Sequence, residues 1–351
     1  MWQLMGQTRV VSLLQHGLEK GTLAHAYLLV GPPHVGKMTL ALNLAQARNC
    51  PADEPPCGQC PSCQRIASAK HADVQVIGLA QGPEEDKAQA EISIEQIRQL
   101  QHSANLPPFE GRCKVFIIDG AEFMSNEAAN CLLKTLEEPA ERVTFILLTA
   151  AERALPATVI SRCQRLELTP LPAAAIEAEL INQPGIEPEK ARLLARLCHG
   201  CPGRAFSAAA DDGWLRQRAE QMETLTGLVR AGYEERFDYA AQLAKQFSRN
   251  RAAVQEILGL WLDFWRDLML IKAGGADNIT NVDLEARLIE IAGDYSLAEI
   301  RTAIGNIQAA EAQLRLNANP RLALEVLMLN IPRKEKRSGH NGATPLSVKH
   351  G

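Results

Sequence analysis

Two glycines and a lysine at residues 31–37 could form a phosphate-binding loop. The segment reads Gly-Pro-Pro-His-Val-Gly-Lys, with Gly31 and Gly36 at the two turns and Lys37 after the second glycine. In such a loop, backbone N–H groups surround phosphate oxygens and the lysine contacts the β- and γ-phosphates. Two glycines and a lysine at this spacing are common by chance, so the flanking segments decide whether the pattern is a P-loop. An apolar run at 26–30 precedes it and a helical pattern at 39–47 follows, which predicts a P-loop that binds nucleotide.

The residue after the lysine argues against efficient hydrolysis. P-loops normally place Ser or Thr there, because its hydroxyl binds Mg²⁺, and here the position holds Met38. Thr39 follows, but it lies about 100° further around the helix and is a poor substitute. ATP with Mg²⁺ is therefore a candidate ligand of the loop, whereas efficient ATP hydrolysis is not expected.

An acidic residue at the end of an apolar run is the second candidate for nucleotide chemistry. The run Val115–Ile118 ends in Asp119, as in a Walker B strand, and Asp119 could hold Mg²⁺ through water. ATPases of the AAA+ class usually place Glu next, but here Gly120 and Ala121 come before Glu122. The alternative is that Asp119 only caps the following turn. The missing adjacent Glu is a second indication against hydrolysis.

Four cysteines that follow the helical pattern at 39–47 have the spacing of a structural zinc site. They are Cys50, Cys57, Cys60 and Cys63. Four thiolates complete a tetrahedral Zn²⁺ shell and leave no open position for catalysis. The alternative is four unpaired structural cysteines, but cysteine is normally buried, and a cluster in a polar, proline-rich loop needs a reason. The other cysteines are scattered and are expected to be small buried residues.

Two arginines stand where they could contact a nucleotide. Arg162, in Ile-Ser-Arg-Cys at 160–163, precedes the last apolar run and could reach a neighbour's nucleotide from the domain edge as an arginine finger. Arg204 follows Gly-Cys-Pro-Gly at 200–203, opens a helix, and could contact nucleotide from the lid side. From spacing alone, an ordinary surface arginine is an equally good interpretation of each.

Five short apolar runs must position these residues. They lie at 26–30, 73–77, 114–118, 144–148 and 164–168. Helical stretches separate the later runs, which predicts βαβ units and a parallel sheet. An amphipathic helix is predicted at 8–24, and the polar segment 81–89 is expected to be a mobile loop. The predicted domains are 1–168 with the cysteine module at 50–63, a helical lid at 169–212, an all-α domain at 213–332 and a disordered tail at 333–351.

Composition and charge argue against a membrane protein, an exported protein and a strongly basic DNA-binding protein. The 351 residues are 46% hydrophobic and 22% charged with a net charge of −4, so contact with DNA requires a local patch or a larger assembly. No apolar stretch reaches the length of a membrane span, and the first residues lack the layout of a signal peptide. A cytoplasmic protein with reduced or metal-bound thiols is expected.

Together these elements resemble the bacterial DNA polymerase III clamp-loader subunits, the delta-prime and gamma/tau branch of the AAA+ class. The resemblance spans nearly the whole chain. Its matching segments are Gly6-Gln7, His25-Ala-Tyr-Leu-Leu, the loop at 31–37, the four cysteines, Ile118-Asp119, Leu132-Leu-Lys-Thr-Leu-Glu-Glu-Pro139, Ser161-Arg162-Cys163, Pro202-Gly203-Arg204 and 317–325. The altered positions 38 and 120, the ending near 329 and the absence of a long extension favour the delta-prime side.

The resemblance implies a P-loop AAA+ domain, a lid and a helical collar domain in a hetero-pentamer with gamma/tau and delta subunits. The family opens the sliding clamp and places it on primed DNA. This chain would act mainly as a stator, with Arg162 completing the ATP site of a gamma-type neighbour. Polymerase activity belongs to the holoenzyme, and no polymerase site is expected here.

Two alternatives remain at this point. In the first, the chain is an active gamma-like ATPase in which Thr39 and Glu122 replace the missing groups. In the second, it is a zinc-containing DNA-repair module unrelated to clamps, which the net charge and the lack of a concentrated basic stretch disfavour.

Overall fold

A computed structural model of the chain describes residue 2 and residues 4–79, 91–316 and 318–333. The polar segment 81–89 and, apart from Arg333, the predicted disordered tail at 333–351 lie outside the described residues. The chain divides into two compact units, Met1–Asp212 and Gly213–Gly351, each of which is described by itself. The predicted separation of the first unit into a nucleotide-binding domain and a lid stays a prediction.

The first unit is built on a five-stranded parallel sheet in the order β2-β3-β4-β1-β5. Its strands are β1 (Ala26–Val30), β2 (Val74–Ile77), β3 (Lys114–Asp119), β4 (Val143–Thr149) and β5 (Gln164–Glu167). The three central strands are almost fully buried, because helices cover both faces, and this explains their continuous apolar sequences. The predicted α/β class with a five-stranded parallel sheet is confirmed.

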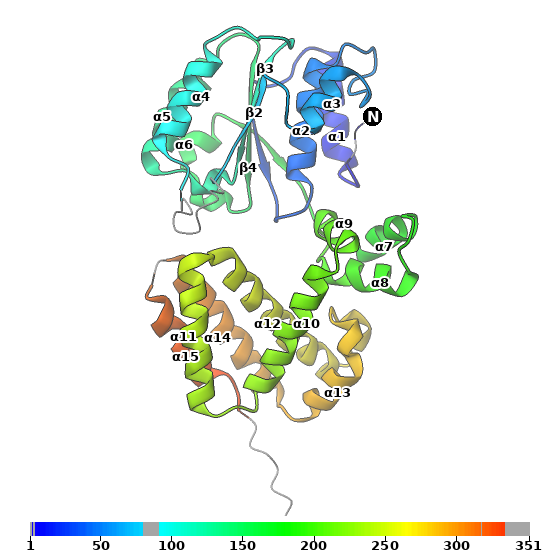
Figure 1. Ribbon diagram of the computed structural model, residues 1–351, viewed down its shortest axis with the longest axis vertical. Coiled ribbons are helices and arrows are strands. Elements are labelled where there is room, and N and C mark those ends of the chain that lie inside the picture. The colour runs from blue at the N-terminus through cyan, green and yellow to red at the C-terminus, as the bar shows by residue number, and fades with distance from the viewer. Residues whose placement is uncertain (1, 3, 80–90, 317, 334–351) are drawn as a thin grey trace, which may run out of the picture. The chain divides into compact units, whose positions relative to one another are not determined.

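Helices cover the two faces of this sheet in two groups (Figure 1). One group is α1 (Thr8–Glu19), α2 (Lys37–Asn49) and α3 (Pro61–Ala67), and the other is α4 (Ile94–Ala104), α5 (Asn126–Glu137) and α6 (Ala157–Ile160). Leu14, Leu44 and Ile66 bury the first group against the sheet, and Leu100 and Leu132 bury the second. Short 3-10 turns follow β3 (η1, Ala121–Phe123) and β4 (η2, Glu152–Ala154).

The helix predicted at 8–24 ends earlier, at Glu19. Gly21 adopts a left-handed φ of 65°, and the N–H of Lys20 donates to the carbonyl of His16. Glycine in this conformation just after a helix is a common C-terminal stop. The chain then enters β1 without further helix.

The remainder of the first unit is helical, with α7 (Ala173–Ile181), α8 (Pro188–Leu197) and α9 (Pro202–Ala210). Helix α9 reaches the P-loop, because Gly203 N–H donates to the carbonyl of His34 at 3.0 Å. A Cβ at position 203 would lie 2.8 Å from that oxygen, so only glycine allows this approach.

The second unit is all-α, as predicted. Its helices are α10 (Gly213–Leu228), α11 (Tyr233–Arg249), α12 (Arg251–Lys272), α13 (Glu285–Gly293), α14 (Leu297–Arg315) and α15 (Pro320–Asn330), with 3-10 turns η3 (Ala276–Asn278) and η4 (Val282–Leu284). The long helix α12 carries Trp261, Phe264 and Trp265 into the core of this unit. Among the described residues, no helix combines the length and the apolar character that crossing a membrane requires.

Candidate nucleotide and metal sites

The glycine-rich loop joins β1 to α2 in the predicted strand–turn–helix arrangement. Gly31 N–H donates to the carbonyl of Thr149 at 3.1 Å, which ties the loop to the end of β4. A Cβ at position 31 would lie 2.6 Å from the Leu168 carbonyl oxygen, and Gly36 enters the helix at a φ of 111°. Both glycines are therefore required by the backbone path. Lys37 Nζ donates to the carbonyls of Gly31 and Pro32 at 2.6 and 2.8 Å.

Two carboxylates lie in the electrostatic environment of Lys37. Burial lowers the pKa of Lys37, whereas the negative charges of Glu122 and Asp119 act in the opposite direction. Burial raises the pKa of Asp119, Lys37 lowers it and Glu122 raises it. The fold thus brings the P-loop lysine, the end of β3 and the turn after β3 together. A cation at this place would relieve the repulsion between the two carboxylates.

Glu122 is the residue of this site that the sequence indicated least, only through the alternative of an active ATPase. Its Oε1 accepts a hydrogen bond from Ala150 N–H at 2.9 Å. Its Oε2 is buried, and no described residue donates a hydrogen bond to it. The sequence pattern of an ATPase places the glutamate at residue 120. In this structure the 3-10 turn η1 instead brings residue 122 toward the P-loop, so the pattern does not point to Glu122.

The other site positions differ from those of an active ATPase. Met38 is half-buried and packs against the apolar cluster of α1, α2 and the sheet, whereas Thr39 is exposed. Gly120 has a φ of 71°, and a Cβ there would lie 2.7 Å from Cδ2 of Phe123. A glutamate at 120 would therefore be strained and would clash.

The two arginines occupy different parts of the first unit. Arg162 follows α6, donates from Nη1 to the carbonyl of Thr158 at 2.8 Å and forms an ion pair with Glu137 at the end of α5. Arg204 lies in the first turn of α9. Burial raises the pKa of Cys201, while the charges of Arg204 and Lys37 lower it, so both cations lie near this thiol. The structure brings Arg204 to the P-loop side and holds Arg162 at α5 and α6.

The four cysteines converge at one point between α2 and α3. Their sulfur atoms all lie within 4.8 Å of one another, and Cys50 and Cys60 Sγ are 4.0 Å apart. Tetrahedral Zn²⁺ with Zn–S bonds near 2.3 Å needs S···S distances of about 3.8 Å. Backbone N–H groups of Cys57, Cys60 and Cys63 each donate to the sulfur of the preceding cysteine, at 3.5, 3.3 and 3.4 Å. The cluster is therefore compatible with a closed, structural zinc site.

Hydrogen bonds favour a thiolate at part of this cluster. The backbone N–H groups of Cys60 and Gln59 lower the pKa of Cys57 to about 6. Burial raises the pKa of Cys63 to about 12. A bound Zn²⁺ supplies the charge that would ionise the buried thiol as well.

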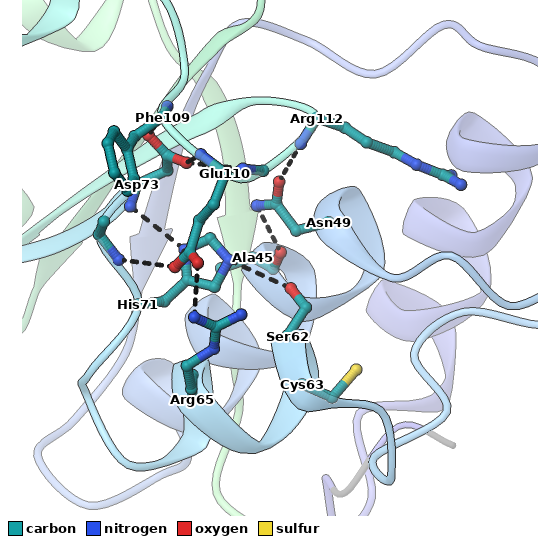
Figure 2. Close-up of polar contacts among 12 residues, drawn as sticks. Ala45, Asn49, Ser62, Cys63, Arg65, His71, Asp73, Phe109, Glu110 and Arg112 are labelled. Atoms are coloured by element: carbon teal, nitrogen blue, oxygen red, sulfur yellow. Dashed lines mark hydrogen bonds and ion pairs between the residues drawn. The ribbon is translucent and has the colours of Figure 1, made fainter.

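Polar side chains from α2 and from the loops before β2 and β3 hold the cysteine module, and the sequence did not indicate them (Figure 2). Gln46 Nε2 of α2 donates to the Cys63 carbonyl at 2.9 Å. His71, which is buried, places Nε2 3.2 Å from Ser62 Oγ in α3. Arg65 of α3 forms an ion pair with Glu110, whose carboxylate also lies 3.7 Å from His71 Nδ1, so these contacts hold one face of α3.

The loop before β3 completes this attachment (Figure 2). The carboxylate of Asp73 accepts backbone N–H bonds from Phe109, Glu110 and Gly111 at 2.7, 2.8 and 2.7 Å. Asn49 Oδ1, at the end of α2, accepts from the N–H groups of residues 112 and 113 at 2.9 and 3.1 Å. Two buried side chains thus fix a five-residue backbone segment, and this segment holds Glu110 against α3.

Each of the two units matches a known protein family. Residues 6–172 match the family described as "DNA polymerase III, delta subunit", and residues 213–333 match "DNA polymerase III, delta subunit, C terminal".

Individual relatives agree with these families. The DNA polymerase III subunit delta' of Bacillus subtilis (strain 168) is 32% identical over 335 residues, which cover 93% of this chain and 97% of that protein. The DNA polymerase III subunit tau of Escherichia coli (strain K12) is 29% identical over 93% of this chain, which spans 52% of that longer protein. Among solved structures, a gamma subunit-related protein from Thermotoga maritima is 20% identical, with a TM-score of 0.43 over 91% of this chain and 98% of that one.

Proposed function

The chain belongs to the DNA polymerase III delta-subunit family and is a delta'-type member of it, and from this premise we propose that it is a subunit of the clamp loader. In this role it helps to open the ring-shaped sliding clamp and to place it on primed DNA during replication. The observation that carries the proposal is the match to a delta' subunit over nearly the full length of both chains.

Within the loader, the chain acts mainly as a stator and not as a motor. This is supported by Met38, which packs among apolar residues and carries no hydroxyl, and by Gly120, whose left-handed backbone disfavours the carboxylate that hydrolysis uses. Gly31, Gly36, Lys37, Asp119 and Arg204 retain the character of a nucleotide site. Bound ATP with Mg²⁺ would then stabilise the unit without turnover.

The partners are gamma/tau and delta subunits, and contact with the clamp and with primed DNA comes through the assembly. The all-α unit at 213–332 serves as the collar that joins the subunits. Arg162 acts in trans, as an arginine finger that stabilises the charge of the transition state in a gamma-type neighbour. Zn²⁺ on the four cysteines has a structural role.

The test uses a loader reconstituted from the full chain with gamma/tau and delta subunits. Arg162→Ala should leave assembly intact and lower the ATPase rate of the loader, stimulated by clamp and primed DNA, several-fold. A much larger loss is expected at the one affected site, because an arginine finger contributes roughly 10³–10⁵ in turnover. Arg153→Ala, an exposed arginine in η2, is the matched control. An unchanged rate in an intact assembly would exclude the finger.

A second candidate function is an active ATPase, favoured by the position of Glu122. Its buried Oε2 and its charge near Lys37 could supply the carboxylate that residue 120 lacks. In that case the isolated chain would hydrolyse ATP, and both Lys37→Ala and Glu122→Gln would abolish the activity. Binding of ATP without turnover by the isolated chain would leave the stator as the function.

A further inference from the structure

Two segments of the chain that are far apart in sequence meet in one ion pair. Glu137 closes the segment Leu-Lys-Thr-Leu-Glu, the end of α5, and Arg162 is the central residue of Ser-Arg-Cys after α6. The guanidinium bonds the Glu137 carboxylate through Nη2 and Oε1, while Nη1 donates to the Thr158 carbonyl at 2.8 Å. Two of the guanidinium nitrogens are thereby oriented by groups of the chain itself.

The position of Glu137 at the end of α5 explains why it is paired with a cation. The C-terminus of a helix carries a partial negative charge, so a carboxylate there is unfavourable unless a cation lies beside it. Arg162 supplies that cation to Glu137. In the same turn, His25 Nε2 donates to the Leu136 carbonyl at 3.0 Å. The last turn of α5 is therefore a point at which both a carbonyl and a carboxylate receive partners from other segments.

We propose that Glu137 is a positioning residue for Arg162, and this inference rests on the role of Arg162 as a finger proposed above. A free arginine samples many rotamers, and ordering it at the moment of catalysis reduces the rate at the neighbour's site. Glu137 and the Thr158 carbonyl hold the guanidinium in an oriented state at the edge of the unit before a neighbour is present. The neighbour's nucleotide then meets a side chain that is already ordered.

The exposure of the pair keeps this arrangement reversible. The side chains of Arg162 and Glu137 are 32% and 49% exposed, so water and salt screen the attraction between them. An exposed pair contributes little to the stability of the fold. A change at Glu137 should therefore leave folding and assembly intact and affect only the state of the arginine.

The experiment compares Glu137→Gln with Glu138→Gln in the reconstituted loader. Glu138 is the neighbouring exposed carboxylate, so its substitution makes the same change in charge. Glu137→Gln should lower kcat of the loader ATPase roughly two- to threefold, a smaller loss than that caused by Arg162→Ala. The KM for ATP should stay unchanged, because the finger acts in the transition state and not in ground-state binding. Glu138→Gln should behave as wild type.

Arg162→Ala, measured in parallel, distinguishes a failure of the positioning role of Glu137 from a failure of the finger role of Arg162. If Arg162→Ala slows the loader and Glu137→Gln does not, the positioning role is wrong and the finger stands. If neither variant slows the loader, the finger itself is wrong and the positioning role fails with it.

A second readout uses the isolated full chain and does not depend on a partner. The guanidinium nitrogen signals of Arg162, assigned by comparison with Arg162→Lys, should show hindered rotation in the wild type and in Glu138→Gln. In Glu137→Gln these signals should average, because the guanidinium rotates freely. The thermal unfolding midpoint of this variant should stay unchanged. Identical signals in wild type and Glu137→Gln would overturn the proposal.

Discussion

Gly120 shows how one residue can keep a catalytic group out of a site. Its backbone is left-handed, at a φ of 71°, and the ring of Phe123 occupies the space that a Cβ would take. The turn η1 instead directs Glu122 toward the end of β4, where Ala150 N–H donates to it. A glutamate at position 120 is therefore disfavoured in this turn, by the backbone conformation and by the Phe123 ring.

Gly120→Glu should lower the free energy of unfolding by about 1–3 kcal/mol and should not create ATPase activity. Urea unfolding followed by circular dichroism measures the cost. Gly21→Glu is the matched control, because Gly21 has a similar φ of 65° but nothing within 4 Å of its Cβ position. It should show the backbone strain without the clash. Equal costs for the two variants would mean that Phe123 makes no difference.

Asp73 is a second residue whose effect can be isolated. Burial opposes ionisation of its carboxyl, but the N–H groups of Phe109, Glu110 and Gly111 outweigh it, so the pKa of Asp73 lies below its ordinary value. A carboxyl with a depressed folded-state pKa stabilises the fold above its unfolded-state pKa of about 4. That contribution is lost as the pH falls through the lower, folded-state pKa.

Asp73→Asn should therefore lower the free energy of unfolding by about 1–3 kcal/mol at pH 7. The difference from wild type should shrink as the pH falls below about 4, because the wild-type carboxyl then becomes neutral as well. Urea unfolding of both proteins between pH 3 and pH 7 measures it. Glu141→Gln, at an exposed position, should show little difference at any pH. A gap that stays constant to pH 3 would contradict the ionised role of Asp73.

At the scale of elements, helix α3 depends on the cysteines at its first turn. A seven-residue helix is too short to be stable alone, and it is held by the cysteine cluster, by His71 and by Glu110. Glu110 lies in the segment that Asp73 and Asn49 fix before β3. The cysteine module and this segment should therefore lose order together.

Removal of the metal tests this coupling. The purified chain should contain about one Zn²⁺, and a chelator should raise amide exchange in residues 50–67 and, less strongly, in residues 109–113. Cys50→Ser should have the same effect, and Cys131→Ser, outside the cluster, should not. A metal-free preparation with unchanged exchange throughout would show that the cysteines need no zinc.

The elements themselves were largely predictable from the sequence, and the reason is burial. Strands β1, β3 and β4 are covered on both faces, so their apolar runs mark them clearly. The attachment of the cysteine module was not predictable, because Asp73 and Asn49 act on backbone N–H groups about 36 to 64 residues away and leave no local pattern. Glu122 was indicated only as part of one alternative for a related reason, since its position depends on a three-residue turn.

At the scale of the whole molecule, the two units should unfold separately. The all-α unit contains an unusual internal anchor, the buried side chain of Arg236. It donates to the carbonyls of Leu228, Met328 and Ile331 at 2.9, 3.0 and 2.8 Å, which ties the ends of α10 and α15 to α11. Burial lowers the pKa of Arg236. Its planar fork satisfies carbonyl groups that a lysine could not reach together.

Arg236→Lys should lower the stability of the all-α unit by about 2–4 kcal/mol, because buried carbonyls lose their donors. Calorimetry should show one transition moving to lower temperature while the transition of the first unit stays in place. Arg301→Lys, at an exposed position of α14, should move neither. A shift of both transitions by Arg236→Lys would show that the two units unfold as one.

Membership of the clamp-loader family could be predicted from sequence motifs, and the comparisons confirm it. The roles of individual residues in the assembly remain proposals, since Arg162 would act on a nucleotide that another chain holds. No pattern within one sequence can show where that neighbour lies. The two curated relatives described above are DNA polymerase III subunits.

The half-buried Met38 has a consequence for the evolutionary history open to this protein. A Met38→Thr reversion would supply a metal-binding hydroxyl but would remove apolar contacts with the cluster around α2, at a cost of about 1–3 kcal/mol. It would not by itself supply the missing carboxylate, because the backbone at Gly120 and the ring of Phe123 disfavour a glutamate there. Each single step back toward a motor is thus a loss. If the chain acts as a stator, a return to hydrolysis would therefore require changes at both positions, each of which costs stability on its own.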